Sequence, residues 1–166
     1  MEVFPVEIAF KDEAIWLGWV SPEEGHSFFL TSNGLLIFSG DSKEELAREV
    51  VKSFPDAQME VETFFDFNPV FGEFDKNVIL KNNFALDAWN LLIDLYYTFD
   101  SDGAIFFESS VEVYRRLFSQ SEAALMVGVH GVALSKEDME VVRKVFLEGL
   151  ELLAKKINVA RSVRSH

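Results

Sequence analysis

The pattern of apolar and polar positions changes near residue 40, from short strand-like runs to helical periods. Four mainly apolar runs come first, at residues 3–10, 14–20, 26–31 and 35–39. Turn residues separate them, and the Asn-Gly pair at 33–34 is a strong signal for a tight hairpin. Because such short connections force neighbouring strands to run antiparallel, this part of the chain predicts an antiparallel β-meander.

Helical signals dominate the rest of the chain. Ser42 and Glu45 have the spacing of a capping box, and Ser135 stands where a cap of the last helix is expected. The third expected helix is short and is followed by a break, whereas Gly149 inside the last one indicates a close approach to another element. The four segments with helical periods are 42–54, 84–99, 111–118 and 136–157.

Strands followed by helices predict an α+β fold, in which the N-terminal antiparallel β-meander packs against the C-terminal helices. Residues 60–66 alternate like one further strand. The length of 166 residues is typical of one domain, which we expect over residues 1–158. Residues 159–166 then form a flexible basic tail.

The helix at 84–99 is almost wholly apolar apart from one polar stripe, formed by Asp87, Asn90 and Asp94. Their spacings of three and four residues place them on one helical face. Carboxylates beside an apolar core need solvent, a cationic partner or another molecule. Our first interpretation is a structural polar seam, in which Arg115 or Arg116 of the next helix pairs with one of the carboxylates.

The net charge of −13 is unevenly distributed along the chain and bears on the kind of partner that the protein can bind. Residues 1–60 carry 12 acidic and 4 basic side chains, whereas residues 135–166 carry 5 and 7. An acidic field repels the phosphates of nucleic acid and accelerates association with basic proteins. We therefore expect no nucleic-acid partner.

The expected location is the cytoplasm. The amino terminus is acidic at Glu2 and Glu7 and lacks the basic region of a secretory signal, and the chain contains no cysteine. The polar stripe interrupts the most apolar window, so no membrane span is expected.

Five phenylalanines and three carboxylates crowd into residues 64–75, FFDFNPVFGEFD. Aromatic anchors beside acidic groups suit the binding of a basic protein, because the anchors supply affinity and the charges supply association rate. The alternative is that the phenylalanines fold under the helices as core. The candidate contacts are Asp66, Phe71, Glu73, Phe74 and Asp75.

Recognisable catalytic signatures are missing from the chain. His26, His130 and His166 are widely separated, and no oriented group accompanies them. The acidic turn at 100–103 does not match a calcium loop, because Ser109 stands where the bidentate glutamate belongs. We therefore predict no catalytic residue, no metal and no cofactor.

Residues 86–95, LDAWNLLIDL, resemble a helix found in a group of bacterial proteins of unknown function. In that group a Leu-x-Ala-Trp-Asn-Leu segment with a following Asp precedes a Tyr-x-x-Leu-Phe element and a closing helix with Gly-Leu. The similar elements here are residues 114–118 and 149–150, and beyond Phe118 the group's Gly-, Asn- and Pro-rich segment is replaced by SQSEAALMVGV. The resemblance covers roughly residues 80–155. It implies a bacterial cytosolic protein and transfers no catalytic residue.

The preferred hypothesis from the sequence is a non-enzymatic, acidic protein-binding module of the immunity or antitoxin type, with a basic protein as its partner. The acidic first two-thirds of the chain and the segment at 64–75 motivate it. A homodimer that buries the surplus aromatic side chains is a further possibility.

The competing hypothesis is a small-molecule-binding protein or hydrolase with a pocket between the sheet and the 84–99 helix. Trp16, Trp19 and Trp89 would line it, and the carboxylates of the polar stripe would supply its polar groups. A cavity at Asp94 favours this hypothesis. An ion pair between Asp94 and an arginine in a filled core favours the first.

Overall fold

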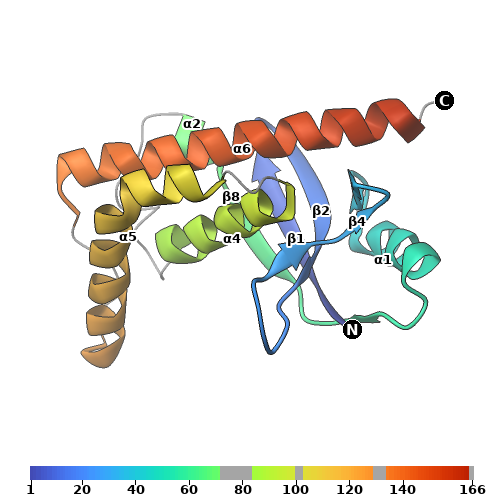
Figure 1. Cartoon of the computed structure of the whole chain (residues 1–166), viewed down its shortest axis with the longest axis horizontal. Helices are drawn as coiled ribbons and strands as arrows, with labels where there is room; N and C mark the ends of the chain where they lie inside the picture. The colour runs from blue at the N-terminus through green and yellow to red at the C-terminus, as the bar shows by residue number, and fades with distance from the viewer. Residues whose placement is uncertain (72–83, 100–102, 129–133, 165–166) are drawn as a thin grey trace.

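The computed structural model describes residues 1–71, 84–99, 103–128 and 134–164, and it confirms the α+β class. Figure 1 shows a twisted sheet, with the helix α1 (Lys43–Ser53) on one side and the helices α4 (Phe84–Phe99) and α6 (Lys136–Arg164) on the other. The long helix α6 runs across the whole length of the molecule (Figure 1). The sheet and these helices position the site described below.

The two long strands form the centre of the sheet. β1 (Glu2–Phe10) pairs antiparallel with β2 (Glu13–Val20), and Lys11 and Asp12 form the tight turn between them. Both turn residues have positive φ, at 50° and 63°, as the mirror-image hairpin turns require. This is the first hairpin of the predicted meander.

Short strands complete the meander. β3 (Phe28–Phe29) and β6 (Phe38–Ser39) both pair antiparallel with β2. Between them, β4 (Thr31–Ser32) and β5 (Leu35–Leu36) form a separate two-stranded hairpin. Its turn residues Asn33 and Gly34 have φ of 54° and 76°, which confirms the hairpin signal in the sequence.

The sheet is mixed, because two strands pair parallel with β1. These are β7 (Gln58–Met59) and β8 (Thr63–Asp66), and the second lies within the strand expected at 60–66. The helix α1 connects β6 to β7, and a helical crossover can bring a strand back in parallel orientation. The sequence indicated the antiparallel part of this sheet and gave no sign of the parallel pairing.

Two helices begin with the predicted caps. The hydroxyl of Ser42 accepts a hydrogen bond from the backbone N–H of Glu45 over 3.2 Å, and the hydroxyl of Ser135 accepts one from Asp138 over 3.0 Å. The helices after α1 are α2 (Asn68–Phe71), α4 (Phe84–Phe99), α5 (Gly103–Met126) and α6 (Lys136–Arg164).

No helix among the described residues combines the length and the apolar composition needed to cross a membrane.

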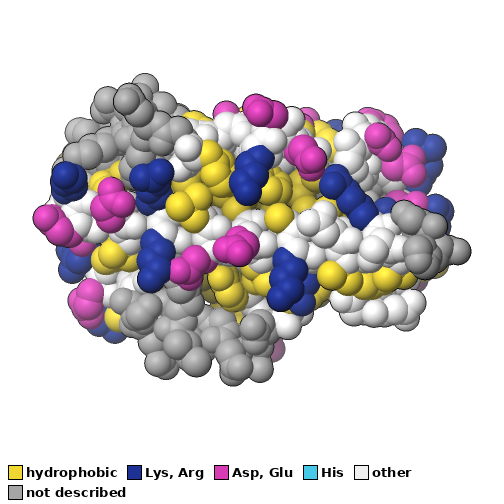
Figure 2. All heavy atoms as spheres, turned by 90° about the horizontal axis from the view of Figure 1, so that it is seen from above, with side chains coloured by type: hydrophobic (Ala, Val, Ile, Leu, Met, Phe, Trp, Pro, Cys, Tyr) yellow, Lys and Arg dark blue, Asp and Glu magenta, His cyan; other side chains and the backbone are white. Residues whose placement is uncertain are grey.

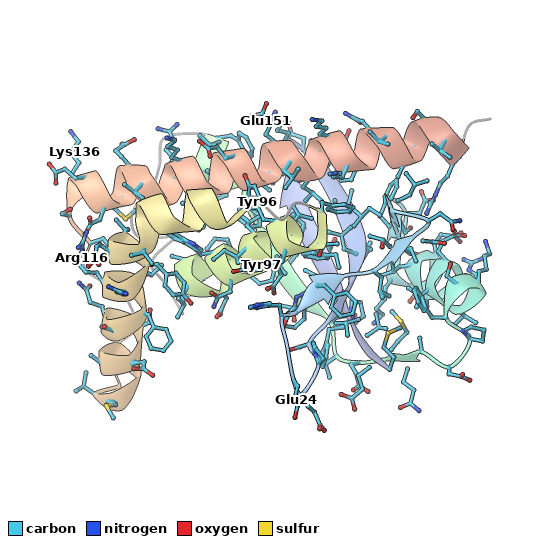
Figure 3. The ribbon with its side chains drawn as sticks, viewed as in Figure 1. Glu24, Tyr96, Tyr97, Arg116, Lys136 and Glu151 are labelled. Atoms are coloured by element: carbon cyan, nitrogen blue, oxygen red, sulfur yellow. The ribbon has the colours of Figure 1, made fainter. Side chains whose placement is uncertain are left out.

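The helix α5 differs from the expectation at both ends. The short helix predicted at 111–118 lies inside a helix of 24 residues that continues past the expected break. Arg116 of α5, labelled in Figure 3, binds Asp138, near the start of α6, through two hydrogen bonds of 2.9 and 2.7 Å. This bidentate ion pair joins α5 to α6 and lowers the pKa of Asp138.

Hydrophobic side chains pack on both faces of the sheet, since successive residues of a strand point to opposite sides. Leu17 belongs to the larger cluster, with Trp89 of α4 and Phe146 of α6, and all three are fully buried. Val20 belongs to a smaller cluster, with Leu46 of α1. Two layers of core therefore hold the sheet between α1 and the helices α4 and α6.

The C-terminal end of α6 packs on the sheet. The expected end near Ile157 is wrong, since the helix continues to Arg164 and Ala160 is 1% exposed. The guanidinium of Arg164 donates to the backbone carbonyl of Phe38 over 3.2 Å and lies 4.8 Å from the centre of the Phe38 ring. The basic residues of this segment thus contact the sheet through residue 164.

The outer face of the molecule along α6 carries charges of both signs. Figure 2 shows basic and acidic side chains interspersed there with hydrophobic ones. This agrees with the near balance of charge in residues 135–166.

Candidate ligand pocket

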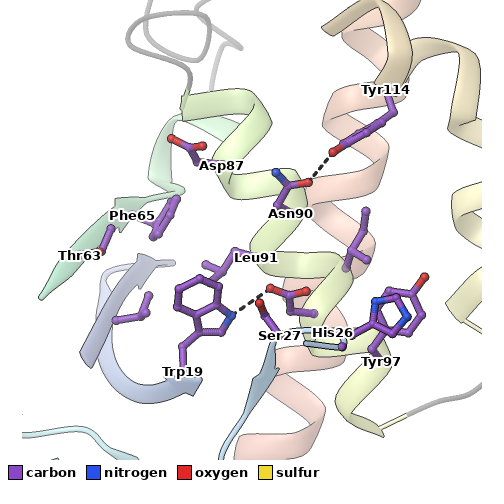
Figure 4. Close-up of a pocket in the computed structure, with 14 residues that line it drawn as sticks. Trp19, His26, Ser27, Thr63, Phe65, Asp87, Asn90, Leu91, Tyr97 and Tyr114 are labelled. Carbon is purple, nitrogen blue, oxygen red and sulfur yellow. Dashed lines mark hydrogen bonds between the residues drawn. The ribbon is translucent and has the colours of Figure 1, made fainter. Parts of the chain in front are cut away.

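A pocket of about 610 Å³ lies between the polar stripe of α4 and the sheet. Figure 4 shows α4 between Trp19 and Phe65 on the sheet side and Tyr114 of α5 on the other. We call it the α4 pocket. Its lining residues are Val6, Trp19, Gly25, His26, Ser27, Thr63, Phe65, Asp87, Asn90, Leu91, Ile93, Asp94, Tyr97 and Tyr114.

The whole polar stripe lines the α4 pocket, and two of its members bind other elements. Asp94 accepts a hydrogen bond from the indole N–H of Trp19 over 2.9 Å, and Asn90 accepts one from the hydroxyl of Tyr114 over 2.8 Å (Figure 4). Asp87 is exposed in the pocket wall. The stripe therefore faces a pocket that is also lined by β1, β2, β8, α5 and the segment between β2 and β3.

Thr98 continues the stripe and attaches the strand β3 to α4. Its hydroxyl accepts a hydrogen bond from the backbone N–H of Phe29 over 2.9 Å and donates one to the carbonyl of Asp94 over 2.7 Å. Phe29 is 2% exposed, so this hydroxyl satisfies a backbone group beside the core. The contact fixes β3 to α4 beside the pocket.

The segment 21–27, between β2 and β3, supplies one wall of the pocket. His26 in this segment stacks on Tyr97 of α4, with ring centroids 4.5 Å apart and planes 12° from parallel (Figure 4). Tyr97 is 42% exposed, so the stacked pair lies at the solvent side of the pocket. The stacking places the imidazole ring of His26 near the carboxylate of Asp94.

The pocket raises the pKa values of its acidic groups. Partial burial raises the pKa of Asp94 to about 6, although the hydrogen bond from Trp19 and the nearby His26 oppose the rise. Neighbouring atoms partly desolvate the carboxyl group of Asp87 and raise its pKa too, although the residue as a whole is exposed. None of the described residues that line the pocket is a lysine or an arginine. The carboxylates thus face the cavity without a lysine or arginine in its described wall.

The pKa of Tyr114, on α5, is also raised in the pocket. Burial raises the pKa of its hydroxyl, the hydrogen bond to Asn90 opposes this, and the charge of Asp94 adds to the rise. Its ring also packs on Trp89, with the ring centroids 5.7 Å apart. Tyr114 therefore lies between the core and the cavity.

The ion pair expected at the polar stripe is replaced by other contacts. Arg115 forms an ion pair with Glu112 over 2.8 Å, and Arg116 forms one with Asp138. The carboxylate partners of these two arginines therefore lie on α5 and α6. The salt bridges found for these arginines are thus to residues other than Asp87 and Asp94. Sequence spacing placed the stripe on one face, but the rotation of α5 about its axis decided where its arginines point.

One of the three tryptophans proposed for the pocket lies in it. Trp19 lines the cavity, whereas Trp16 packs against the smaller hydrophobic cluster and Trp89 is fully buried in the larger one. Tyr114 was not among the residues expected in the pocket, and no partner was expected for His26. No local signal marks either residue, because their neighbours in the pocket come from distant parts of the chain.

The segment proposed to bind a partner divides between core and surface. Asp66 is exposed and accepts a hydrogen bond from the backbone N–H of Asn68 over 2.9 Å. Phe71 is half-buried, with the ammonium of Lys11 lying 5.3 Å from its ring centre. Phe67 is fully buried. Glu73, Phe74 and Asp75 lie outside the described residues, as do the expected turn at 100–102 and the histidines His130 and His166.

In the part of the chain that the structure describes, no three or more histidine, aspartate or glutamate side chains are grouped to hold a metal ion. The two carboxylates of the α4 pocket lie seven residues apart on one helix, and the neighbouring groups are aromatic, amide and hydroxyl side chains. The polar groups of the pocket therefore suit hydrogen bonding and charge pairing with an organic molecule.

The fold and the pocket define an α+β protein with a cavity of ligand size beside its sheet. Comparison of the chain with protein-family models, with curated proteins and with solved structures found no match. The similarity of residues 86–95 to the bacterial group stays a resemblance.

Proposed function

We propose that this protein binds a small organic molecule in the α4 pocket. The observation that carries the proposal is a cavity of about 610 Å³ at the polar stripe. The alternative expectation was a filled core in which an arginine pairs with Asp94. Ligand pockets of proteins typically measure about 300–1,000 Å³ and combine apolar walls with a few placed polar groups. The α4 pocket has this size and this composition.

The cost of placing Asp94 in the pocket supports a role beyond folding. Its carboxylate is partly buried and its pKa is raised, so the charged form is disfavoured there. The hydrogen bond from Trp19 needs only an acceptor, which a neutral amide also provides. A perturbed carboxyl group in a cleft is a frequent mark of a functional site.

The spacing of the carboxylates favours binding over hydrolysis by this pair. The Cα atoms of Asp87 and Asp94 are seven helical positions apart, about 10 Å along the axis of α4. Carboxylates that act together on one glycosidic bond flank it from two sides. Two groups on one helix wall suit two contacts along a single bound molecule.

The test is a ligand screen read by nuclear magnetic resonance. The indole N–H of Trp19 lies in the pocket, whereas Trp89 is fully buried and Trp16 packs on the other side of the sheet. A ligand of the pocket is expected to shift the Trp19 indole resonance and to leave that of Trp16 in place. Trp19→Phe assigns the resonance. A broad screen in which no compound shifts Trp19 selectively would remove the proposal.

A second candidate is the acidic protein-binding module expected from the sequence. The observation that favours it is the strand β8, where Phe64 is 57% exposed between the carboxylates of Glu62 and Asp66. Its test is binding to a purified basic partner with Asp66, Glu73 and Asp75 reversed to lysine. Unchanged affinity would remove this surface, and the homodimer stays a prediction that sedimentation at two concentrations addresses.

A further inference from the structure

We infer that the α4 pocket selects an organic cation, with an ammonium group against Asp94 and an apolar or aromatic body along the sheet side. This inference rests on the proposed function and adds the chemical class of the ligand. It follows from the charges, the aromatic faces and the free acceptor capacity of the pocket.

The described residues of the pocket wall include two carboxylates and one histidine. Asp87 and Asp94 both line the cavity, and no lysine or arginine stands among its described lining residues. An anionic ligand would meet two carboxylates without a fixed counter-charge, whereas a cation would gain from both. Partial burial strengthens this difference, because charges interact more strongly where water is displaced.

Asp94 retains capacity for another donor. Its Oδ2 accepts the indole N–H of Trp19, while a carboxylate offers about four acceptor positions on two oxygens. An ammonium group donates three hydrogen bonds and would stabilise the charged form that burial disfavours. Ligand binding thus offsets the cost that partial burial imposes on this side chain.

Aromatic side chains surround the carboxylates and suit the rest of such a ligand. Trp19 and Phe65 lie on the sheet side, and Tyr97 and Tyr114 on the helical side (Figure 4). The faces of aromatic rings attract cations within about 6 Å of the ring centre. Leu91 adds apolar surface between them. This combination of rings and carboxylates is typical of sites that bind organic amines.

Three compounds that differ only in their terminal group test the inference: 2-phenylethylamine, 2-phenylethanol and 3-phenylpropionate. At pH 7.5 the amine is expected to bind at least tenfold more tightly than the alcohol, since it adds a charge-assisted hydrogen bond to the same phenyl body. The propionate is expected to bind more weakly than the alcohol. The readout is the dissociation constant from the Trp19 indole resonance.

Asp94→Asn locates the effect. This variant is expected to lose at least tenfold in affinity for the amine and to bind the alcohol as the wild type does. Asp56→Asn is the matched control, because Asp56 is exposed and lies outside the pocket while the change in net charge is the same. Equal losses in both variants would show a general field effect and overturn the contact with Asp94.

The pH dependence gives a second readout. The titratable groups that line the pocket with Asp94 are Asp87 and Tyr97 on its own helix, His26 from the segment 21–27 and Tyr114 from α5. As the pH falls from 7.5 to 5, the affinity for the amine is expected to drop about tenfold, because Asp94 becomes protonated. The same drop should remain in His26→Gln, which separates Asp94 from the charge of the histidine. A drop that disappears in this variant would assign the effect to His26 and contradict the role of Asp94.

The outcomes separate the inference from the proposed function. An alcohol or a propionate that binds as tightly as the amine, or a screen whose ligands are mainly neutral or anionic, overturns the inference and leaves a ligand-binding pocket. A pocket that no compound occupies overturns both.

Discussion

The indole N–H of Trp19 donates a hydrogen bond to Oδ2 of Asp94 over 2.9 Å and joins residues 75 positions apart in the chain. It connects the strand β2 to the polar stripe of α4 and forms part of the pocket wall. The acceptor in this contact is a carboxylate whose charged form is disfavoured by burial. A structural contact and a candidate binding group thus share one side chain.

Asp94→Asn is expected to stabilise the free protein at neutral and higher pH. The pKa of Asp94 is about 6 in the fold against 3.8 as its ordinary value, so stability is lost as the pH rises from 3.8 through 6 and the full cost is present above pH 6. The full shift would correspond to about 3 kcal/mol, which partial solvent exposure reduces to about 1–2 kcal/mol. Urea denaturation at pH 8 measures the difference in the free energy of unfolding.

The sign of this effect can be checked with pH. Below pH 3.8 the carboxyl group is protonated in both states, and the penalty disappears. The advantage of Asp94→Asn is therefore expected to shrink as the pH falls from 7 to 4. A variant that is less stable than the wild type at pH 8 would show that the charged carboxylate is structural.

Thr98→Val is expected to destabilise the fold by about 1–2 kcal/mol. The substitution keeps the shape of the side chain but leaves the backbone N–H of Phe29 without its acceptor beside the core. Thermal or urea unfolding measures the loss. Thr98→Ser, which keeps the hydroxyl, is the control and should recover most of the stability; an equal loss in both variants would assign the effect to packing.

Gly149→Ala is expected to destabilise by about 1–2 kcal/mol, although alanine favours a helix by up to about 1 kcal/mol. A Cβ atom at this position would lie 2.9 Å from both methyl groups of Leu92 and 3.0 Å from its Cβ, so rotation of the leucine cannot relieve the contact. Urea denaturation measures the loss. A Leu92→Ala background removes both methyl groups and leaves only the Cβ contact of 3.0 Å, so the same change should cost less there, and an undiminished penalty would contradict the clash with the methyl groups.

Deletion of residues 159–166 is expected to lower the free energy of unfolding by about 1–3 kcal/mol, because it removes buried and hydrogen-bonded groups. Ala160 is 1% exposed, and Arg164 donates to the carbonyl of Phe38. The control is deletion of residues 165–166 alone. Equal stability of the two shortened chains would support the flexible tail that the sequence indicated.

Local chemistry was predictable where it depends on neighbours in the sequence. The caps at Ser42 and Ser135, the Asn33-Gly34 turn and the close approach at Gly149 are all present in the structure. Each involves backbone needs that one or two residues satisfy. The α+β class follows from the same signals, since strand and helix periods are local patterns.

Pairings between distant segments were not predictable. The parallel pairing of β8 with β1 depends on how α1 returns the chain, and the length of α5 depends on contacts such as that of Arg116 with Asp138. For the same reason, the arginines expected at the polar stripe face Glu112 and Asp138. Side-chain spacing does not determine the rotation of a helix against its neighbours.

By itself, the sequence determined that Asp87, Asn90 and Asp94 share one face of a buried helix, because a period of 3.6 residues leaves no other arrangement. Only the tertiary structure decided what that face meets: Trp19 from β2, Tyr114 from α5 and a cavity between them. The reason is physical. The helix places its polar groups through local hydrogen bonds, but their surroundings are built by the packing of elements that lie far apart in the chain.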